Sequence, residues 1–201
     1  MGERTVRVRT AGQGDRDLLI GILDAAFQSD PVSGWLFPDP EYRRAVHPRL
    51  VAALTGLVLN EGWADVTEDG SACALWLSEP ARDKGAHAED DGPARLREAI
   101  DPDNERVELV GRLTGAAHPS DRAHLYLPLI GVLPDRQGKG LGTALLGPVL
   151  DRCDREGLPA YLEASNPGSR GLYERLGFTD REPLDLPDGP RVWPMWREPR
   201  G

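Results

Sequence analysis

The sequence predicts an α/β fold, in which a sheet is covered by amphipathic helices. Two observations lead to this prediction. Residues 125–142 combine an apolar strand, a turn and a glycine-rich loop that opens a helix. Elsewhere, stretches that alternate between apolar and polar residues are interspersed with stretches of helical periodicity. The length of 201 residues suits a single domain with its own core.

The first eighty residues are expected to form a strand, two helices and a hairpin. In order, these are the strand 5–10, the helix 18–27, a turn-rich link over 29–40, the helix 46–58 and the strands 63–67 and 72–77. Alternation predicts the strands, and apolar residues three and four apart predict the helices. Asp30-Pro31 should follow the end of the first helix, Pro48 fits best in the first turn of the second, and Asp69-Gly70 favours a tight turn between the strands.

The glycine-rich loop is the most informative stretch of the chain. An apolar run ends at Leu133, and Pro134-Asp135 supply turn chemistry. Gly138, Gly140 and Gly142 follow at alternate positions, where missing Cβ atoms allow a phosphate to approach the backbone. A helix begins near the last glycine, so its unpaired N–H groups and positive dipole end point to the same place. The sequence therefore predicts a diphosphate-binding loop.

Spacing argues against two of the three classes of protein that use such a loop. A P-loop nucleotidase needs Gly, four residues, Gly-Lys and then Ser or Thr, but Leu133 stands at the first glycine and Gly140 replaces the hydroxyl residue. A dinucleotide-binding fold needs G-x-G-x-x-G. Counting from Gly138, the third glycine would be Thr143, and counting from Gly140 it would be Leu145.

The third class fits. Residues 137–142 (QGKGLG) match the pattern Q/R-x-x-G-x-G/A and resemble the signature of the GNAT superfamily of N-acetyltransferases. Residues 161–166 (YLEASN) and 172–178 (LYERLGF) resemble the neighbouring strand and the short helix of that superfamily, which Gly177 would close. The segment 125–201 looks like the puromycin N-acetyltransferase type, whereas the resemblance is weak before residue 81 and negligible from there to the loop strand.

The resemblance implies a GNAT-type fold, with a central mixed, mostly antiparallel sheet that is splayed at the cofactor site and has helices on both faces. The remaining expected elements are a helix from about 141 that contains Pro148, a strand at 158–164, a helix at 169–176, and last strands at 178–186 and 192–196, where Pro194 restricts pairing. Residues 79–120, with short helices at 95–100 and 105–113, are expected to be an insertion. It either covers the acceptor side of the site or is a solvated surface excursion.

The resemblance also implies where acetyl-CoA binds. Its pantetheine is expected to pair with strand backbone around Ile130 and Val132, and the Val132 N–H would hold the carbonyl oxygen as charge develops. The residues expected to hold the diphosphate are Gln137, Gly138, Lys139, Gly140, Leu141, Gly142 and Thr143. Lys139 is alternatively an exposed cation of little effect. Asn166 either touches the cofactor or stabilises the turn before Pro167.

Two residues are expected to carry the chemistry. Tyr173 matches the general acid that protonates the departing thiolate, because a phenol stays protonated at neutral pH; alternatively it is only packed. Glu163 interrupts an apolar strand and is the expected general base. It is alternatively a salt-bridged or outward-facing carboxylate, with the amine losing its proton through water. His118 and His124 flank the loop strand and are reserve bases, for which a structural or solvated role is the alternative.

Composition limits the partners. The 24 basic and 33 acidic residues give a net charge of −9, which disfavours nucleic acid. Cys73 and Cys153 lack metal or disulfide spacing, so no metal is expected. No apolar signal core is found at the N-terminus, and the longest nearly apolar run, 50–59, is too short to span a bilayer, so we expect no membrane association and a cytoplasmic location.

These observations together predict a single domain over 1–201 that transfers the acetyl group of acetyl-CoA to a primary amine of a small molecule, as a monomer or homodimer. The alternative is a non-catalytic module of the same fold that binds acyl-CoA as a sensor. The acceptor itself is not predicted, because its pocket should come from 29–40 and 79–120, where the resemblance fades.

Overall fold

The computed structural model describes residues 6–82 and 91–201. The strands are β1 (Val8–Thr10), β2 (Trp63–Thr67), β3 (Ala72–Glu79), β4 (His124–Val132), β5 (Ala160–Ala164), β6 (Thr179–Asp180), β7 (Leu184–Asp185) and β8 (Arg191–Arg197). The helices are α1 (Arg16–Phe27), α2 (Pro31–Leu36), α3 (Pro40–Glu61), α4 (Gly92–Ile100), α5 (Glu105–Ala117), α6 (Leu141–Glu156) and α7 (Pro167–Arg175), with 3-10 turns η1 (Gln13–Asp15) and η2 (Pro134–Arg136). Thr5 of the first expected strand and residues 83–90 of the expected insertion lie outside the described residues.

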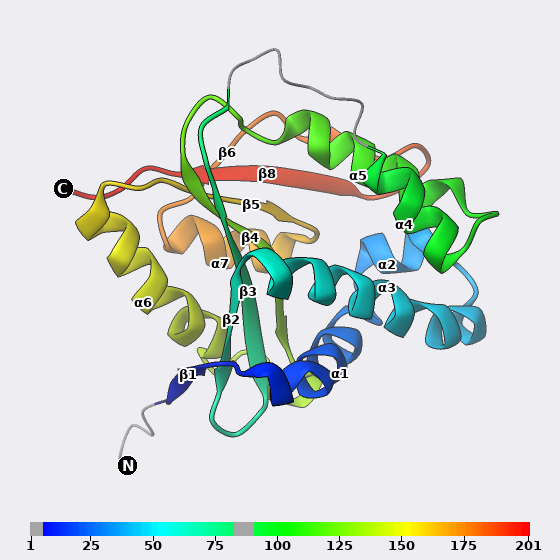
Figure 1. Ribbon diagram of the computed structural model, residues 1–201, viewed down its shortest axis with the longest axis horizontal. Coiled ribbons are helices and arrows are strands. Elements are labelled where there is room, and N and C mark those ends of the chain that lie inside the picture. Colours follow the sequence, from blue (N-terminus) through cyan, green and yellow to red (C-terminus); the bar gives the residue numbers. More distant parts are fainter. Residues whose placement is uncertain (1–5, 83–90) are drawn as a thin grey trace.

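One sheet runs through the molecule in the order β1-β2-β3-β4-β5-β8-β6, and β7 pairs with β8 (Figure 1). In the described part of the chain, β4 and β5 are parallel and the other pairs are antiparallel. The mixed, mostly antiparallel sheet is therefore confirmed.

Helices cover both faces of the sheet, and the alternation of β3 shows why. Ala72, Ala74 and Trp76 face a core built with α6 and α7, whereas Cys73 and Leu75 face a core built with α1 and α3. All five are fully buried. Because successive side chains of a strand point to opposite faces, this near-continuous apolar run belongs to a central strand covered on both sides.

A third core cluster lies beyond the sheet, where α2, α3, α4 and α5 meet the β7–β8 hairpin. Trp35 of α2 anchors it. The indole Nε1 donates to the Pro187 carbonyl at 3.0 Å, and a Cβ on Gly189 would lie 2.5 Å from the Trp35 ring, so only glycine allows this approach. Arg106 of α5 donates to the Trp35 carbonyl at 2.5 Å. These contacts fix α2 between α5 and the β7–β8 hairpin.

Two expectations for the N-terminal half are wrong. The link expected over 29–40 contains the helix α2, whose N-cap Asp30 accepts from the Val32 N–H at 2.9 Å. The next helix begins earlier than expected, at Pro40, where Asp39 accepts from the Tyr42 N–H at 2.7 Å. Pro48 therefore lies inside α3 rather than in its first turn. Both Asp-Pro pairs are helix starts, with a capping carboxylate followed by a proline that has no N–H to lose.

The later elements follow the expectations more closely. The hairpin, the loop strand β4, and the helices within 95–100 and 105–113 are present, and Gly177 closes α7 with φ of +95°. The strand expected over 178–186 is instead two short strands, β6 and β7, separated by a stretch that contains Pro183. Within 6–82 and 91–201, no helix is long and apolar enough to cross a lipid bilayer.

Candidate active site

The three glycines of the glycine-rich loop are required for different reasons. Gly138 and Gly140 have φ of +72° and +78°, which glycine adopts without strain, and a Cβ on either would meet no protein atom within 4 Å. Gly142 differs, because its Cβ would lie 2.8 Å from Leu172 Cδ2. Gly142 therefore allows Leu172 of α7 to pack against the start of α6, and it also lines the cavity described below.

The first turn of α6 has the features of an anion site. Its N-cap, Gly140, offers no side chain to the helix, and the first turn contains no acidic residue. The Gly140 carbonyl accepts from the Ala144 N–H at 3.0 Å, where the helical ladder begins. The preceding N–H groups, those of Leu141 to Thr143, have no carbonyl partner within the helix by helical geometry. They and the positive end of the helix dipole favour an anion here.

The sheet is splayed beside this loop. Pairing between β4 and β5 runs from Leu125 to Leu127 on β4 and stops. Pro128 follows and has no N–H to continue the ladder. Beyond it, Ile130 and Val132 remain paired with β3 on one side, and no described strand covers them on the other. The expected splay is present, and it begins where Pro128 interrupts β4 and where the register of β4 with β3 shifts.

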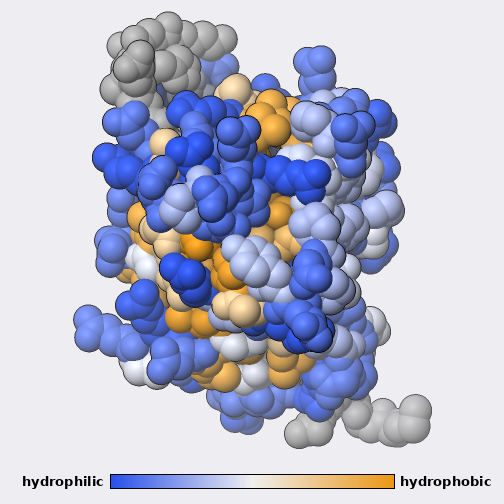
Figure 2. Space-filling view, turned by 90° about the vertical axis from the view of Figure 1, so that its right-hand side faces the viewer, coloured by the Kyte–Doolittle hydropathy of each residue, from blue (hydrophilic) through white to orange (hydrophobic). Residues whose placement is uncertain are grey.

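A cavity of about 840 Å³ extends from the loop, through the splay, to α3 and α5. Every expected cofactor residue except Lys139 lines it. Its far end is apolar, with Leu54 from α3, Leu96 from α4 and Val110 from α5. Figure 2 shows hydrophobic residues exposed between polar ones on the helical side of the molecule. The helices α4 and α5 therefore form part of the cavity wall.

Glu163 lines this cavity, and its surroundings change its acidity. The Tyr126 hydroxyl donates to Glu163 Oε2 at 2.8 Å, while the buried Oε1 has no hydrogen-bond partner among the described residues. Burial raises the pKa of Glu163 to about 7, although the Tyr126 hydrogen bond acts in the opposite direction. The nearby Tyr161 hydroxyl also lowers this pKa, although it is not positioned to donate a well-formed hydrogen bond to the carboxylate. The alternative of an outward-facing or salt-bridged carboxylate is wrong for this side chain.

Tyr173 lies on α7 and also lines the cavity, with 5% of its surface exposed. Burial, followed by the charge of Asp30, raises the pKa of its hydroxyl. The group is therefore a phenol that stays protonated at neutral pH. Its ring also packs against Phe178, with centroids 6.0 Å apart, so the packing interpretation describes part of its role.

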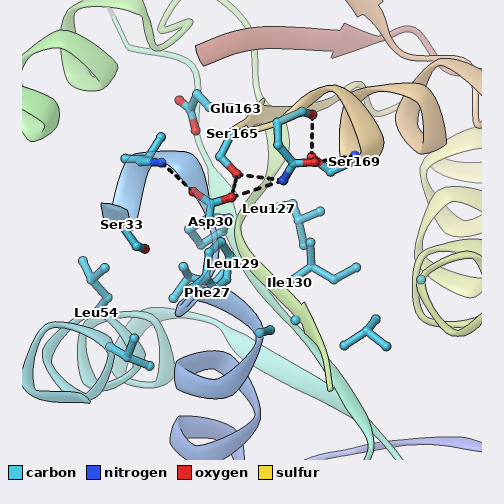
Figure 3. A pocket seen from close by; sticks show the side chains of 18 of the residues that line it. Phe27, Asp30, Ser33, Leu54, Leu127, Leu129, Ile130, Glu163, Ser165 and Ser169 are labelled. Carbon is cyan, nitrogen blue, oxygen red and sulfur yellow. Dashed lines mark hydrogen bonds between the residues drawn. The ribbon is translucent and has the colours of Figure 1, made fainter. Parts of the chain in front are cut away.

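Sequence reasoning did not find the buried carboxylate Asp30. Its Oδ2 accepts from the Ser165 hydroxyl at 2.5 Å, as Figure 3 shows. It also accepts from Asn166 Nδ2 at 3.1 Å. This contact joins the start of α2 to the end of β5. Asn166 also accepts from the Ser169 N–H at 2.9 Å and caps α7, so its turn-stabilising interpretation is confirmed. The only sequence signal at Asp30 is the pair Asp30-Pro31, which predicted a turn-rich link rather than a helix N-terminus.

Two side chains of the glycine-rich loop donate hydrogen bonds to nearby backbone carbonyls. Gln137 Nε2 donates to the Val132 carbonyl at 3.2 Å. Lys139 Nζ donates to the Asp135 carbonyl at 2.8 Å, and Lys139 is absent from the cavity lining. The geometry of Lys139 therefore agrees with the alternative of an exposed cation.

The two reserve bases lie elsewhere. His118 and His124 are joined through their Nε2 atoms at 3.1 Å, and neither lines the cavity. Burial, followed by the charge of His124, lowers the pKa of His118 to about 4. The pair packs against the rings of Tyr126 and Tyr161, with centroids as close as 4.6 Å. Its position favours the structural role over that of a base.

Comparison with known proteins identifies the family. A model described as "Acetyltransferase (GNAT) family" matches residues 63–178, more than half of the chain. Mycothiol acetyltransferase of Streptomyces griseus is 40% identical over 83 residues, covering 39% of this chain and 26% of its own. An uncharacterised N-acetyltransferase of Schizosaccharomyces pombe is 43% identical over 61 residues, covering 30% and 25%. The chain thus spans about a quarter of the length of these curated relatives.

Solved structures resemble the fold over nearly its full length. A Corynebacterium glutamicum protein described as histone acetyltransferase HPA2 and related acetyltransferase has a TM-score of 0.73 and 25% identity, covering 98% of both chains. Arylalkylamine N-acetyltransferase 2 of Aedes aegypti has a TM-score of 0.66 at 14% identity, covering 97% and 99%. The fold is therefore the GNAT fold, and the chain belongs to the GNAT acetyltransferase family.

Proposed function

We propose that this protein transfers the acetyl group of acetyl-CoA to a primary amine carried by an apolar small molecule. The observation that carries the proposal is one continuous cavity that joins an anion site to an apolar pocket and is also lined by Glu163 and Tyr173. Ligand sites of this kind are largely apolar, with a few placed polar groups.

The donor end fits acetyl-CoA. The open space at Gly138 and Gly140 admits a diphosphate, and the N–H groups at the start of α6 hold it. Arg136 and Arg175 line the same cavity and add positive charge. The uncovered edge of β4 offers backbone groups to the amides of pantetheine, as a strand would. Lys139 is not needed for this binding.

The chemistry follows from the acidities. Glu163, with a pKa of about 7, is deprotonated in a large fraction of molecules at neutral pH and takes a proton from the ammonium. The free amine attacks the thioester carbon, and the Val132 N–H stabilises the oxyanion. Tyr173 gives its proton to the departing thiolate. Glu163 and Tyr173 line the same cavity, and an acid and a base with shifted acidities in one site support direct transfer.

The acceptor end favours an amine with an apolar body. Leu54, Leu96 and Val110 surround the pocket, and Asp30 and Glu163 supply negative charge where the ammonium would sit. The resemblance of the C-terminal half to the puromycin N-acetyltransferase type remains a prediction, and a bulky apolar amine is the part of it that this pocket supports.

A panel of amines tests the proposal. Free thiol and acetylated amine would be measured with acetyl-CoA and either apolar amines, such as arylalkylamines, or polar ones, such as amino sugars. We expect equal amounts of both products and a higher kcat/KM for the apolar amines. Binding of acetyl-CoA without amine-dependent thiol release across the panel would support the sensor alternative instead.

A further inference from the structure

Three hydrogen-bonded side chains, those of Ser33, His47 and Asp24, form a group at the wall of the cavity, which Ser33 and His47 line. The Ser33 hydroxyl oxygen is 3.0 Å from Nε2 of His47, and Nδ1 of His47 is 2.6 Å from Oδ1 of Asp24. These residues come from three different helices, α2, α3 and α1. The order is that of a nucleophile, a base and the carboxylate that orients the base.

The proton positions suit activation of the hydroxyl. A carboxylate only accepts hydrogen bonds, so the short contact with Asp24 keeps a proton on His47 Nδ1. In the neutral ring, Nε2 is then the acceptor, and Ser33 donates to it. Asp24 is held in turn by Gln28 Nε2 at 2.8 Å. The serine hydroxyl therefore bonds to a base rather than to a carbonyl of its own helix.

Two of the three side chains also reach the cavity of the candidate active site. Ser33 and His47 are 5% and 2% exposed, and both line the cavity. A hydrogen-bonded tie between three helices explains the burial, but it does not require the hydroxyl to face a cavity. Asp30, which precedes Ser33 on α2, holds this helix against Ser165 at the end of β5. Figure 3 shows Ser33 next to Asp30, on the side of the cavity where Leu54 lies.

We propose that Asp24, His47 and Ser33 form a catalytic triad that moves the acetyl group of acetyl-CoA onto Ser33 and hydrolyses it when no amine is bound. Ser33 Oγ attacks the thioester carbon while its proton passes to His47 Nε2. The C–S bond breaks, its electron pair leaves with sulfur, and His47 returns the proton to the thiolate. Water then loses a proton to His47 and attacks the ester, which releases acetate and restores the Ser33 hydroxyl. This inference rests on the proposed function, since its donor is acetyl-CoA.

A fluorophosphonate probe tests the triad without acetyl-CoA, because an activated serine displaces fluoride from phosphorus. We expect the purified parent protein to be labelled at Ser33, as located by peptide mass spectrometry. Ser33→Ala should abolish the label, and His47→Gln should slow labelling by about 100-fold or more. Asp24→Asn is the second variant if His47→Gln does not fold, because Asp24 is partly exposed. Ser71→Ala is the control, since Ser71 is equally buried at 3% but lies outside the cavity.

Thiol release from acetyl-CoA without amine is the second measurement, with binding followed by calorimetry. We expect slow hydrolysis by the parent and at least about a tenfold loss in Ser33→Ala, with unchanged acetyl-CoA affinity. No label on Ser33, or equal hydrolysis by the parent and Ser33→Ala, would overturn the inference and leave amine acetylation untouched. A parent that binds no acetyl-CoA would instead contradict the proposed function, and with it the acetyl transfer to Ser33.

Discussion

Replacing Glu163 by glutamine should stabilise the protein at alkaline pH while reducing its activity. Glu163 is half-buried in the cavity wall, and its buried Oε1 has no hydrogen-bond partner among the described residues. Glutamine has nearly the same shape and still offers an oxygen to the Tyr126 hydroxyl. The variant therefore removes the buried charge and leaves the packing in place.

The magnitude follows from the acidity of the group. Glu163 titrates at an ordinary value of 4.5 in the unfolded chain and at about 7 in the folded protein. An acid with a raised folded pKa makes the folded state less stable as pH rises between these two values. The difference corresponds to about 3 kcal/mol when fully developed, and contact with solvent in the cavity reduces it to roughly 2 kcal/mol. We expect most of this loss of stability to develop between about pH 4.5 and about pH 7, the two pKa values of the group.

Urea unfolding of the parent and of Glu163→Gln at several pH values measures this directly. Other titrating groups contribute equally to both proteins, so the difference between the two free energies of unfolding isolates Glu163. Glu61→Gln removes an exposed carboxylate at the end of α3 and serves as the control. In parallel, kcat/KM of the parent should rise with pH through about 7, whereas Glu163→Gln should lose about 100-fold or more of its activity and show no such rise.

A stability difference that does not grow with pH would show that Glu163 is not a buried acid of raised pKa. Near-parent activity of Glu163→Gln, with chemistry limiting the rate, would show that water removes the ammonium proton. The two results are independent, so the acidity and the catalytic role are tested separately.

Three further predictions concern the donor and acceptor ends. Tyr173→Phe should fold and bind acetyl-CoA like the parent, but its kcat should fall about 100-fold, and a thioester with a more acidic thiol should recover part of it; near-parent kcat would leave Tyr173 only a packing role. Gly140→Val should remove acetyl-CoA binding in calorimetry, whereas Gly157→Val, with a similar φ of +67° at the other end of α6, should keep it; loss in both would indicate a folding defect. Leu54→Asn should raise the KM of an apolar amine more than the KM of acetyl-CoA. Leu18→Asn, which lies outside the cavity, should change neither KM. Equal effects of Leu54→Asn on both KM values would show that Leu54 does not contact the acceptor.

Local chemistry explains which elements could be predicted. The β2–β3 hairpin depends on Gly70, the loop on Gly138 and Gly140, and the end of α7 on Gly177, and all four have positive φ in the structure. At each position, one residue type fits one backbone conformation, so the sequence carries the information directly. Tyr173 was expected from the resemblance, whereas Glu163 was also marked by its position in an apolar strand, and both side chains line one cavity in the structure.

Contacts between distant segments explain what was missed. Asp30 meets Ser165 across 135 positions of the chain, and no pattern near either residue indicates the other. The same holds for Ser33, His47 and Asp24, which three helices bring together. The start of α2 was not predicted for a different reason: an Asp-Pro pair suits a turn as well as it suits a helix N-terminus. The close approach of Gly142 to Leu172 of α7 is likewise a contact that the spacing of the glycines did not indicate.

The central claim is that one cavity holds the donor and directs the acceptor amine to a point between Glu163 and Tyr173. A crystal structure with coenzyme A bound tests it most directly. We predict the diphosphate at the N–H groups of Leu141 to Thr143, pantetheine along β4 beyond Pro128, and the sulfur beside the Tyr173 hydroxyl. Coenzyme A bound elsewhere, or with its sulfur directed away from both Glu163 and Tyr173, would contradict the account.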